Sequence, residues 1–484
     1  MSKGKVLLVN PNQMRPPVTP VALDYLAQSL EENGFEAEVL DLAFSTDAER
    51  DIQSALRGRD PLLIGVTVRN LDDSYLASQD FCLERTKKII DFIKAHSRAV
   101  LVLGGVGFSV APEAALAYFG VDLGICGEGE QALSLLAQKI EKGGDFQDIP
   151  GLVFRDGTGF RRNPMRPFGL KDAALGRRKA VDNLRYLREG GMVGFESKRG
   201  CNQGCTYCAD PIAKGKRVRL RNPNFVAEEL ANLYQQGIDH FHTCDSEFNL
   251  PANHAMEVCQ RIVQIGLGDK IRWFAYLSPK PFSKELAYWM RKAGCVGIDF
   301  GVDHGNESML RTLGRSYTGE DIRSMARLAK AQGFSLLFDL LLGGPGETRK
   351  TIAEAVDLMK ETSPDRVGIS LGVRLYPGTR LLLQIQAQGL GKENRNLQGS
   401  VEGNPGLLRP LFYLESELGE DIDDYLDRLI GDDRRFLFGN RKQVDRNYNY
   451  NDNSILLKAI AKGYRGAFWD ILRRMASGEP QHSA

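Results

Sequence analysis

Net charge is almost absent from this sequence, in which 63 Lys and Arg residues are balanced by 62 Asp and Glu residues among 484. Proteins that bind the phosphate backbone of nucleic acids usually concentrate a basic excess in one domain or on one face. The balance therefore argues against a nucleic-acid partner. It favours a small-molecule substrate.

Long apolar segments are also missing. No run approaches the roughly 18 consecutive apolar residues that a transmembrane helix requires, and the most apolar stretch, FSLLFDLLLGG, contains Asp339 and ends in glycines. The N-terminal MSKGKVLLVN has too short an apolar run for a signal peptide and no small-residue cleavage site. We therefore expect a soluble, cytoplasmic protein with no integral membrane segment.

Cysteine is too scarce for a disulfide scaffold, because the chain holds only eight in 484 residues. Three of the eight crowd into residues 201–208, which indicates a metal centre. The other five lie inside apolar or helical segments, where free cysteine is commonly a small buried residue without chemistry. These five are Cys82, Cys126, Cys244, Cys259 and Cys295.

The chain length predicts two or three domains, and the first is expected over residues 1–143. There, short apolar runs alternate with helix-like segments, which predicts a doubly wound, flavodoxin-like α/β domain. Ligands of such sheets bind beyond the carboxyl ends of the strands. The small and polar residues expected there, where a large planar ligand can rest, are Asn10, Thr67, Arg69, Asn70, Gly104, Gly105, Val106, Gly107, Gly127, Glu128 and Gly129.

Residues 144–190 are expected to form a linker that begins with a hairpin, GLVFRDGTGFRR, around an Asp-Gly turn. Over residues 191–390 about six strand-helix units follow, which are too few for a closed eight-fold barrel and predict an open partial (β/α)6 barrel. Residues 391–484 are expected to be helical. Their aromatic residues either roof a pocket or pack as core, namely Tyr448, Tyr450, Phe468 and Trp469.

The strongest chemical signal is the loop RGCNQGCTYCAD, which contains Cys201, Cys205 and Cys208 in a Cys-x3-Cys-x2-Cys pattern. Three thiolates on one tight loop can hold three corners of a four-iron four-sulfur cubane and leave the fourth iron open. The alternative is a three-cysteine zinc site that takes a remote fourth ligand.

This motif resembles the radical S-adenosylmethionine signature, including the aromatic Tyr207 before the third cysteine. The resemblance implies that the open iron chelates S-adenosylmethionine, and that an external donor of the flavodoxin or ferredoxin type supplies one electron for its cleavage to a 5'-deoxyadenosyl radical. Later segments resemble the family's other contacts to S-adenosylmethionine. The contacts implied are Asp245, Ser246, Glu247, Asp303, Arg315, Gly344, Gly346 and Glu347.

The first half resembles the cobalamin-binding domain that precedes many radical S-adenosylmethionine domains, in IGVTVRNLDDS, VLGGVGFSVAPE and GICGEGEQAL. The Asp-x-His-x-x-Gly pattern of classical corrinoid domains, whose histidine ligates cobalt, is absent. Arg69 is expected to face the ring, where a guanidinium cannot be an ordinary cobalt ligand because it has no acceptor atom. There it excludes water; the alternative is a surface ion pair with Asp72 or Asp73.

Together these resemblances imply a methyltransferase that moves a methyl group from S-adenosylmethionine through cobalamin to a carbon of a small molecule or of a lipid or natural-product precursor. The segments VTVRNLDDS, CDSEFNLP and LLGGPGET are most similar to the tryptophan 2-C-methyltransferase branch, in which a carboxylate is thought to cap the open iron. Glu247 is the candidate cap. The alternatives are a radical cyclase, ring-contracting or carbon-carbon bond-forming enzyme that uses cobalamin as a redox partner, and a non-catalytic cobalamin or redox sensor.

Two further features have a structural interpretation beside a functional one. The basic run over residues 214–221 either grips an acidic ligand or forms one solvated strand face, which is the commoner case. His240 and His242 share a strand face. They either pack as a hydrogen-bonded pair or transfer protons.

Overall fold

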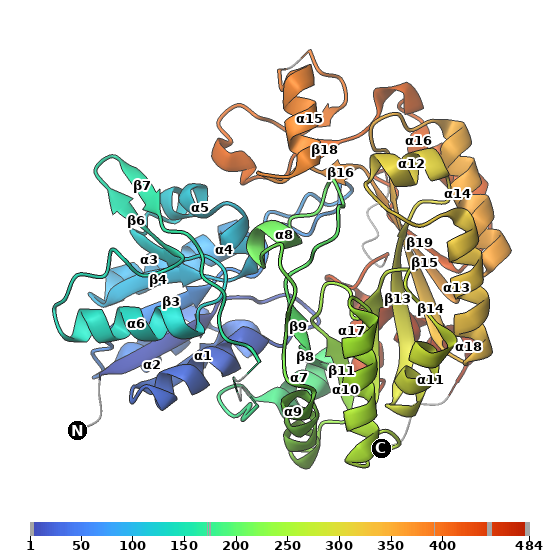
Figure 1. Ribbon diagram of the computed structural model, residues 1–484. Coiled ribbons are helices and arrows are strands. Elements are labelled where there is room, and N and C mark those ends of the chain that lie inside the picture. The colour runs from blue at the N-terminus through green and yellow to red at the C-terminus, as the bar shows by residue number, and fades with distance from the viewer. Residues whose placement is uncertain (1–3, 172, 174–175, 392, 443–447, 480–484) are drawn as a thin grey trace.

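The computed structural model describes residues 4–171, 173, 176–391, 393–442 and 448–479. Two α/β halves lie side by side, with the N-terminal half on the left of Figure 1 and the barrel on the right. The short helix α8 (Asp210–Ala213), which directly follows the three cysteines, lies between them and contacts the first half. No helix within the described part of the chain is both long and apolar enough to span a bilayer.

The first half is built on a seven-stranded sheet with the order β2-β1-β3-β4-β5-β6-β7. Its first five strands are parallel and follow the flavodoxin-like order. Four of them are mainly apolar, whereas the edge strand EAEVLD is partly charged. The strand order confirms the predicted doubly wound fold. The five strands are β1 (Lys5–Asn10), β2 (Glu36–Asp41), β3 (Leu63–Thr67), β4 (Val100–Gly104) and β5 (Leu123–Ile125), and the helices are α1 (Val21–Glu32), α2 (Ala48–Leu56), α3 (Leu83–His96), α4 (Val106–Val110), α5 (Pro112–Phe119) and α6 (Glu130–Glu141).

The hairpin expected in the linker forms as β6 (Leu152–Asp156) and β7 (Gly159–Arg162). It is not a free connection, because β6 pairs antiparallel with β5 and so extends the first sheet. The main chain of the hairpin thereby covers the edge of β5, which would otherwise expose unpaired N–H and C=O groups. The domain boundary at residue 143 stays a prediction.

The second half is an open, parallel barrel sheet with the order β19-β15-β14-β13-β12-β11-β8. The six predicted strands are all present, and the six-strand partial barrel is confirmed. They are β8 (Val193–Phe195), β11 (His240–Thr243), β12 (Arg272–Leu277), β13 (Cys295–Asp303), β14 (Ser335–Leu342) and β15 (Arg366–Leu371), with α9 (Pro223–Gln235), α10 (Ala252–Gln264), α11 (Lys284–Lys292), α12 (Glu307–Thr312), α13 (Gly319–Ala331) and α14 (Arg349–Thr362) among their connections.

The C-terminal segment contains the helices expected there, but it also contributes strands. Strand β19 (Phe436–Phe438) pairs parallel with β15 and widens the barrel sheet. A small antiparallel sheet forms from three two-residue strands and lies at the top of Figure 1, near α15 (Arg380–Gln388). The remaining elements are α7 (Asn183–Gly190), β9 (Lys198–Arg199), β10 (Arg219–Leu220), β16 (Val373–Arg374), β17 (Leu397–Gln398), β18 (Phe412–Tyr413), α16 (Ile422–Ile430), α17 (Ser454–Ala461) and α18 (Phe468–Ser477).

The tail closes one end of the barrel. Trp469, on α18, is 2% exposed and packs edge-on against Phe274 of β12, with 5.8 Å between ring centroids. Tyr450 packs against Phe468, and Tyr448 packs against Tyr75 of the first half. Trp469 is therefore a core residue that closes one end of the barrel, whereas Tyr448 reaches the junction of the two halves.

A buried ion network joins the two halves. Arg178, between the sheets, donates to Asp24 of α1 at 2.8 Å and to Glu229 of α9 at 2.6 Å, and all three side chains are almost completely buried. Arg221 donates to the second oxygen of Glu229 at 2.7 Å, and the hydroxyl of Tyr25 donates to the same carboxylate. Because every charge has a partner of opposite sign, the network is satisfied only when α1 and α9 keep this relative position.

Two further contacts cross the junction. Arg199, two residues before Cys201, pairs with Glu130 of the first half at 2.6 Å. Asp72, in the loop after β3, pairs with Arg374 of β16 at 2.8 Å, and both side chains are buried. These contacts, together with the network around Arg178, therefore tie the two halves together at several separate places.

Replacing Arg178 with Met is expected to lower the free energy of unfolding by about 3–5 kcal/mol, because it leaves Asp24 and Glu229 as buried carboxylates with a missing cation. Arg177→Ala is the matched control. Arg177 is about half exposed and pairs with Glu31 and Glu32 on the surface, so its loss is expected to cost below about 1 kcal/mol. Urea unfolding of both variants measures the difference, and equal losses would contradict the account.

Candidate active site

The cysteine loop runs from β9 to α8 and is held by main-chain hydrogen bonds. The N–H of Cys201 donates to Gly215 O at 3.1 Å, and that of Thr206 donates to Leu313 O at 2.9 Å. Gly314 has a φ of +79°, and a side chain there would collide with the carbonyl of Gly204. The loop is thus fixed from both sides before any ligand binds.

The three thiols suit a cubane cluster. Burial raises the pKa of all three, that of Cys205 to about 11, so a bound metal has to supply the charge that stabilises the thiolates. Across the described residues, no three His, Cys, Asp or Glu side chains converge on one metal ion. In a cubane each of the three thiolates binds a different iron.

Four of the predicted residues meet beside the cysteines. Arg315 donates to Asp303 at 2.5 Å and to Glu247 at 3.3 Å, and Tyr207 donates to Asp303 at 2.6 Å. Burial raises the pKa of Glu247 to about 7, although Arg315 opposes this shift. Arg315 also donates to the hydroxyl of Tyr207 at 3.0 Å, so Glu247 is linked through Arg315 to the cysteine loop.

Other predicted contacts to S-adenosylmethionine are engaged in the fold. Asp245 accepts the N–H groups of Ser197 and Lys198, at 2.9 and 3.1 Å, and so shapes the turn between β8 and β9. Ser246 donates to Asp210 at 2.5 Å. A direct contact of either side chain with S-adenosylmethionine stays a prediction.

In the loop between β14 and α14, one predicted residue is engaged in the fold and two others have space beside them. Glu347 is 1% exposed and binds His304 at 3.1 Å, so its carboxylate points into the protein. Gly346 has a φ of +79° and open space where a side chain would be, and Gly344 has only ordinary contacts around it. The two glycines therefore leave room beside the strand ends, as binding of the adenine of S-adenosylmethionine there requires.

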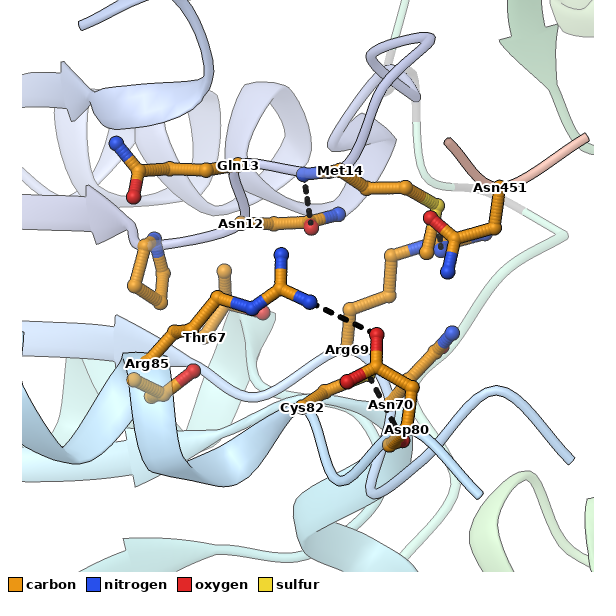
Figure 2. Close-up of a pocket in the computed structure, with 12 residues that line it drawn as sticks. Asn12, Gln13, Met14, Thr67, Arg69, Asn70, Asp80, Cys82, Arg85 and Asn451 are labelled. Carbon is orange, nitrogen blue, oxygen red and sulfur yellow. Dashed lines mark hydrogen bonds and ion pairs between the residues drawn. The ribbon is translucent and has the colours of Figure 1, made fainter. Parts of the chain in front are cut away.

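A hollow opens at the carboxyl ends of β1 and β3 (Figure 2), where a ligand of a doubly wound sheet is expected. Three of the predicted residues line it: Thr67, Arg69 and Asn70. The other lining residues are Pro11, Asn12, Gln13, Met14, Asp80, Cys82, Arg85, Thr86 and Asn451. Asn451 comes from the C-terminal segment, so the hollow is made by distant parts of the chain.

Arg69 does not form the surface ion pair considered as its alternative. Asp72 is bound to Arg374, and Asp73 accepts the hydroxyl of Ser78. The guanidinium instead extends across the hollow toward Met14, whose sulfur lies 3.9 Å from Nη1 (Figure 2). A cation without a carboxylate partner among the described residues therefore faces the expected ring position.

The glycine turn after β4 fits a flat ligand. At Gly105 and Gly107 a side chain would collide with the backbone of residues 68–70, so the two strand-end loops touch. Val106 between them is 44% exposed and offers an apolar surface. Gly104 is the last residue of β4 and leads into this turn. These features fit a corrin.

The remaining predicted residues of the first half have structural partners. Asn10 is 2% exposed and donates to Asp41 and Tyr186, at 2.8 and 3.1 Å. Glu128 binds Arg219 and accepts the N–H of Phe168 at 2.6 Å. Side chains at Gly127 and Gly129 would collide with Met165 and Leu26 respectively. Cofactor contacts at these four positions stay predictions.

Neither interpretation of the basic run describes it fully. Lys216 and Arg217 are exposed, but Lys214, Arg219 and Arg221 pair with carboxylates of the chain itself.

His240 is 5% exposed and bonds Asp239 at 2.8 Å. The ring of His242 packs edge-on against Tyr276 inside the barrel, 4.9 Å between centroids, and burial lowers the pKa of His242 to about 4.

Sequence reasoning missed an acidic pair inside the barrel. Asp299 of β13 and Asp339 of β14 lie against each other, and burial raises the pKa of both carboxyls. Asp299 lies among apolar residues in CVGIDFGV, as Asp339 does in FSLLFDLLL. The sequence signal that could have revealed this pair is an ionisable residue within an apolar strand, because alternate positions of a barrel strand point into the barrel.

Comparison with known proteins identifies both halves. The B12 binding domain matches residues 12–137, and the Radical SAM superfamily matches residues 195–359. The tryptophan 2-C-methyltransferase of Streptomyces laurentii is 32% identical over 97% of this chain and 96% of its own length. An uncharacterized methyltransferase of Pyrococcus horikoshii is 26% identical over 75% of this chain and 77% of its own.

Solved structures of a related enzyme match almost the entire chain. The radical S-adenosylmethionine methyltransferase TsrM from Kitasatospora setae, with cobalamin and a [4Fe-4S] cluster bound, superposes with a TM-score of 0.89 at 33% identity over 99% of this chain and 98% of its own. Its complex with tryptophan substrate and a S-adenosylmethionine analogue gives 0.90 at 32% identity, over 99% of this chain and 100% of its own.

Fold and site thus define a cobalamin-binding radical S-adenosylmethionine protein, as the resemblance implied. More particularly, the chain belongs to the family of cobalamin-dependent radical S-adenosylmethionine methyltransferases that contains tryptophan 2-C-methyltransferase. Its cofactors are a four-iron four-sulfur cluster, S-adenosylmethionine and cobalamin. The methyltransferase prediction is confirmed.

Replacing any one of Cys201, Cys205 and Cys208 with Ala is expected to abolish the intact cluster, because each thiolate holds a separate corner. Cys259→Ala is the matched control, since Cys259 is fully buried in the barrel wall. Iron and sulfide analysis after anaerobic reconstitution measures the effect. Four irons per chain retained in a loop variant would contradict the assignment.

Proposed function

We propose that this enzyme methylates an indole carbon of tryptophan or of a close tryptophan derivative by polar methyl transfer. The observation that carries the polar mechanism is the position of Glu247. Its buried carboxylate accepts from Arg315, which also donates to the hydroxyl of Tyr207 in the cysteine loop. A carboxylate there can occupy the open iron, which would prevent that iron from cleaving S-adenosylmethionine reductively.

When bound, cobalamin would supply a cobalt centre able to carry a methyl group from S-adenosylmethionine to a nucleophilic carbon. The indole carbon forms the new bond and loses its proton, so no net oxidation is required. Arg69, which lines the hollow, would help to hold the ring and keep water from it, and its guanidinium would offer no acceptor atom to cobalt. Thr67, Asn70 and Val106 support the ring from the strand ends.

The remaining assignments concern binding of S-adenosylmethionine and electron supply. Gly344 and Gly346 border its adenine, and Arg315 with Asp303 orients its polar end. Asp303 has a φ of +59°, a rarely populated conformation that places its carboxylate between Arg315 and Tyr207. An electron donor of the flavodoxin or ferredoxin type would return oxidised cobalt to its active state. We further propose a cytoplasmic location.

The test is product analysis of the reconstituted enzyme, loaded with cobalamin and given S-adenosylmethionine, reductant and tryptophan. We expect methyltryptophan and S-adenosylhomocysteine in equal amounts, with no stoichiometric 5'-deoxyadenosine. One 5'-deoxyadenosine per methyl transferred would contradict the polar mechanism.

The variant Glu247→Gln tests directly whether Glu247 occupies the open iron, because the amide keeps the size of the carboxylate but lacks its charge. We expect the variant to form 5'-deoxyadenosine in an amount at least about 10-fold above the wild type, since the iron is then open to S-adenosylmethionine. Glu285→Gln, on the outer helix α11, is the matched control and is expected to behave as the wild type. If Glu247→Gln formed the same products as the wild type, the proposal that Glu247 occupies the open iron would be wrong.

A further inference from the structure

The barrel lumen is built in layers. Along β12, alternate side chains point inward, and Phe274 forms the floor together with Leu337 and Trp469. The next layer is polar. Tyr276 is paired in register with Asp299, and Asp339 is paired with Gly368.

The ring of Tyr276 in this polar layer is only partly covered by other side chains. Tyr276 is 42% exposed, although it lies in a central strand of the sheet and burial raises the pKa of its hydroxyl. Its exposure is therefore to the lumen. Gly368 leaves room for the carboxylate of Asp339, which a side chain at that position would overlap.

The acids have no protein counterion. Asp299 is 5% exposed, and no donor in the described part of the chain reaches its Oδ1. None of the ion pairs among the described residues includes Asp299 or Asp339. Nearby Asp303 and Glu247 add negative charge and further raise the pKa of Asp339 and of Asp299, respectively. An uncompensated buried acid pair is costly for stability, which is typical of a binding site.

Parts distant in the chain complete the pocket. Tyr75 enters from the loop after β3 in the first half, and its hydroxyl interacts with Ser370 of β15 and with Asp339. Its ring packs edge-on against Tyr448, with 5.5 Å between centroids. Aromatic rings therefore surround the acid pair. This combination suits a flat molecule that carries one cation.

We propose that the Asp299–Asp339 pair binds the protonated amine of the substrate and so positions its aromatic ring beneath the first half. This inference rests on the proposed function for the identity of the ring. Two adjacent carboxyls readily share one proton, so the pair carries a single negative charge, which matches a single ammonium group. A charge-assisted hydrogen bond then supplies the donor that Oδ1 of Asp299 lacks.

The test is equilibrium dialysis of the cofactor-loaded enzyme with three probes: tryptamine, phenethylamine and indole-3-propanoate. The variant is Asp299→Asn with Asp339→Asn, and the control is Asp269→Asn, an exposed acid on the outside of the same barrel. We expect the double variant to bind both amines at least about 30-fold more weakly and the propanoate no more weakly than the wild type. The control is expected to bind all three as the wild type does.

Two further readouts separate this role from others. The double variant is expected to melt at the same or a higher temperature, since it removes an uncompensated charge, whereas a structural pair would lower the melting temperature. Formation of S-adenosylhomocysteine and methylcobalamin without substrate is expected to be unchanged. Loss of methylation with unchanged amine binding would assign the pair to proton transfer and overturn the proposal.

The probes also distinguish the two proposals. If phenethylamine binds through the pair but neither indole probe is bound or methylated, the amine site stands and the indole substrate is wrong. If the wild type binds neither amine, or if the double variant binds them equally well, the amine site is wrong whatever the methylated molecule is.

Discussion

The arrangement of this protein depends on one buried ion network between its halves. Asp24 belongs to the first half, Glu229 belongs to the barrel, and Arg178 lies between them with no solvent exposure. A buried charge without its partner is far more costly than a surface one, so the halves are stable in one relative position. That constraint brings the two sheets together into a single site, because the strand ends of both sheets then face the junction.

Proximity follows from this constraint. The pair formed by Asp72 and Arg374 fixes the loop that carries Tyr75 into the barrel, and Arg199 ties the cysteine loop to Glu130. A methyl group that moves in two steps needs its donor, carrier and acceptor held in one place, and fixed geometry removes much of the entropic cost of such a reaction. The buried charges at the junction thus serve the chemistry as well as the fold.

Much of this was predictable from the sequence, since strand-helix alternation and the cysteine spacing are local patterns. The flavodoxin-like sheet, the six-strand barrel and the cluster loop all follow from them. The partners of polar side chains were not predictable, because they come from distant segments: Asn10 binds Tyr186, and Asp245 binds the turn after β8. The acids Asp299 and Asp339 were overlooked for the same reason, because they lie in different strands and meet only in the barrel. Strand β19 is a three-residue strand and gave no periodic signal.

The central claim is that both cofactors face one lumen at a fixed separation. Pulsed electron paramagnetic resonance tests it directly, with the cluster reduced and cobalamin as cobalt(II), so that both carry an unpaired electron. The account predicts a measurable dipolar coupling with a narrow distance distribution in the wild type, which broadens in Arg178→Met while iron and corrinoid contents are retained. Absence of coupling, or a broad distribution in the wild type itself, would contradict it.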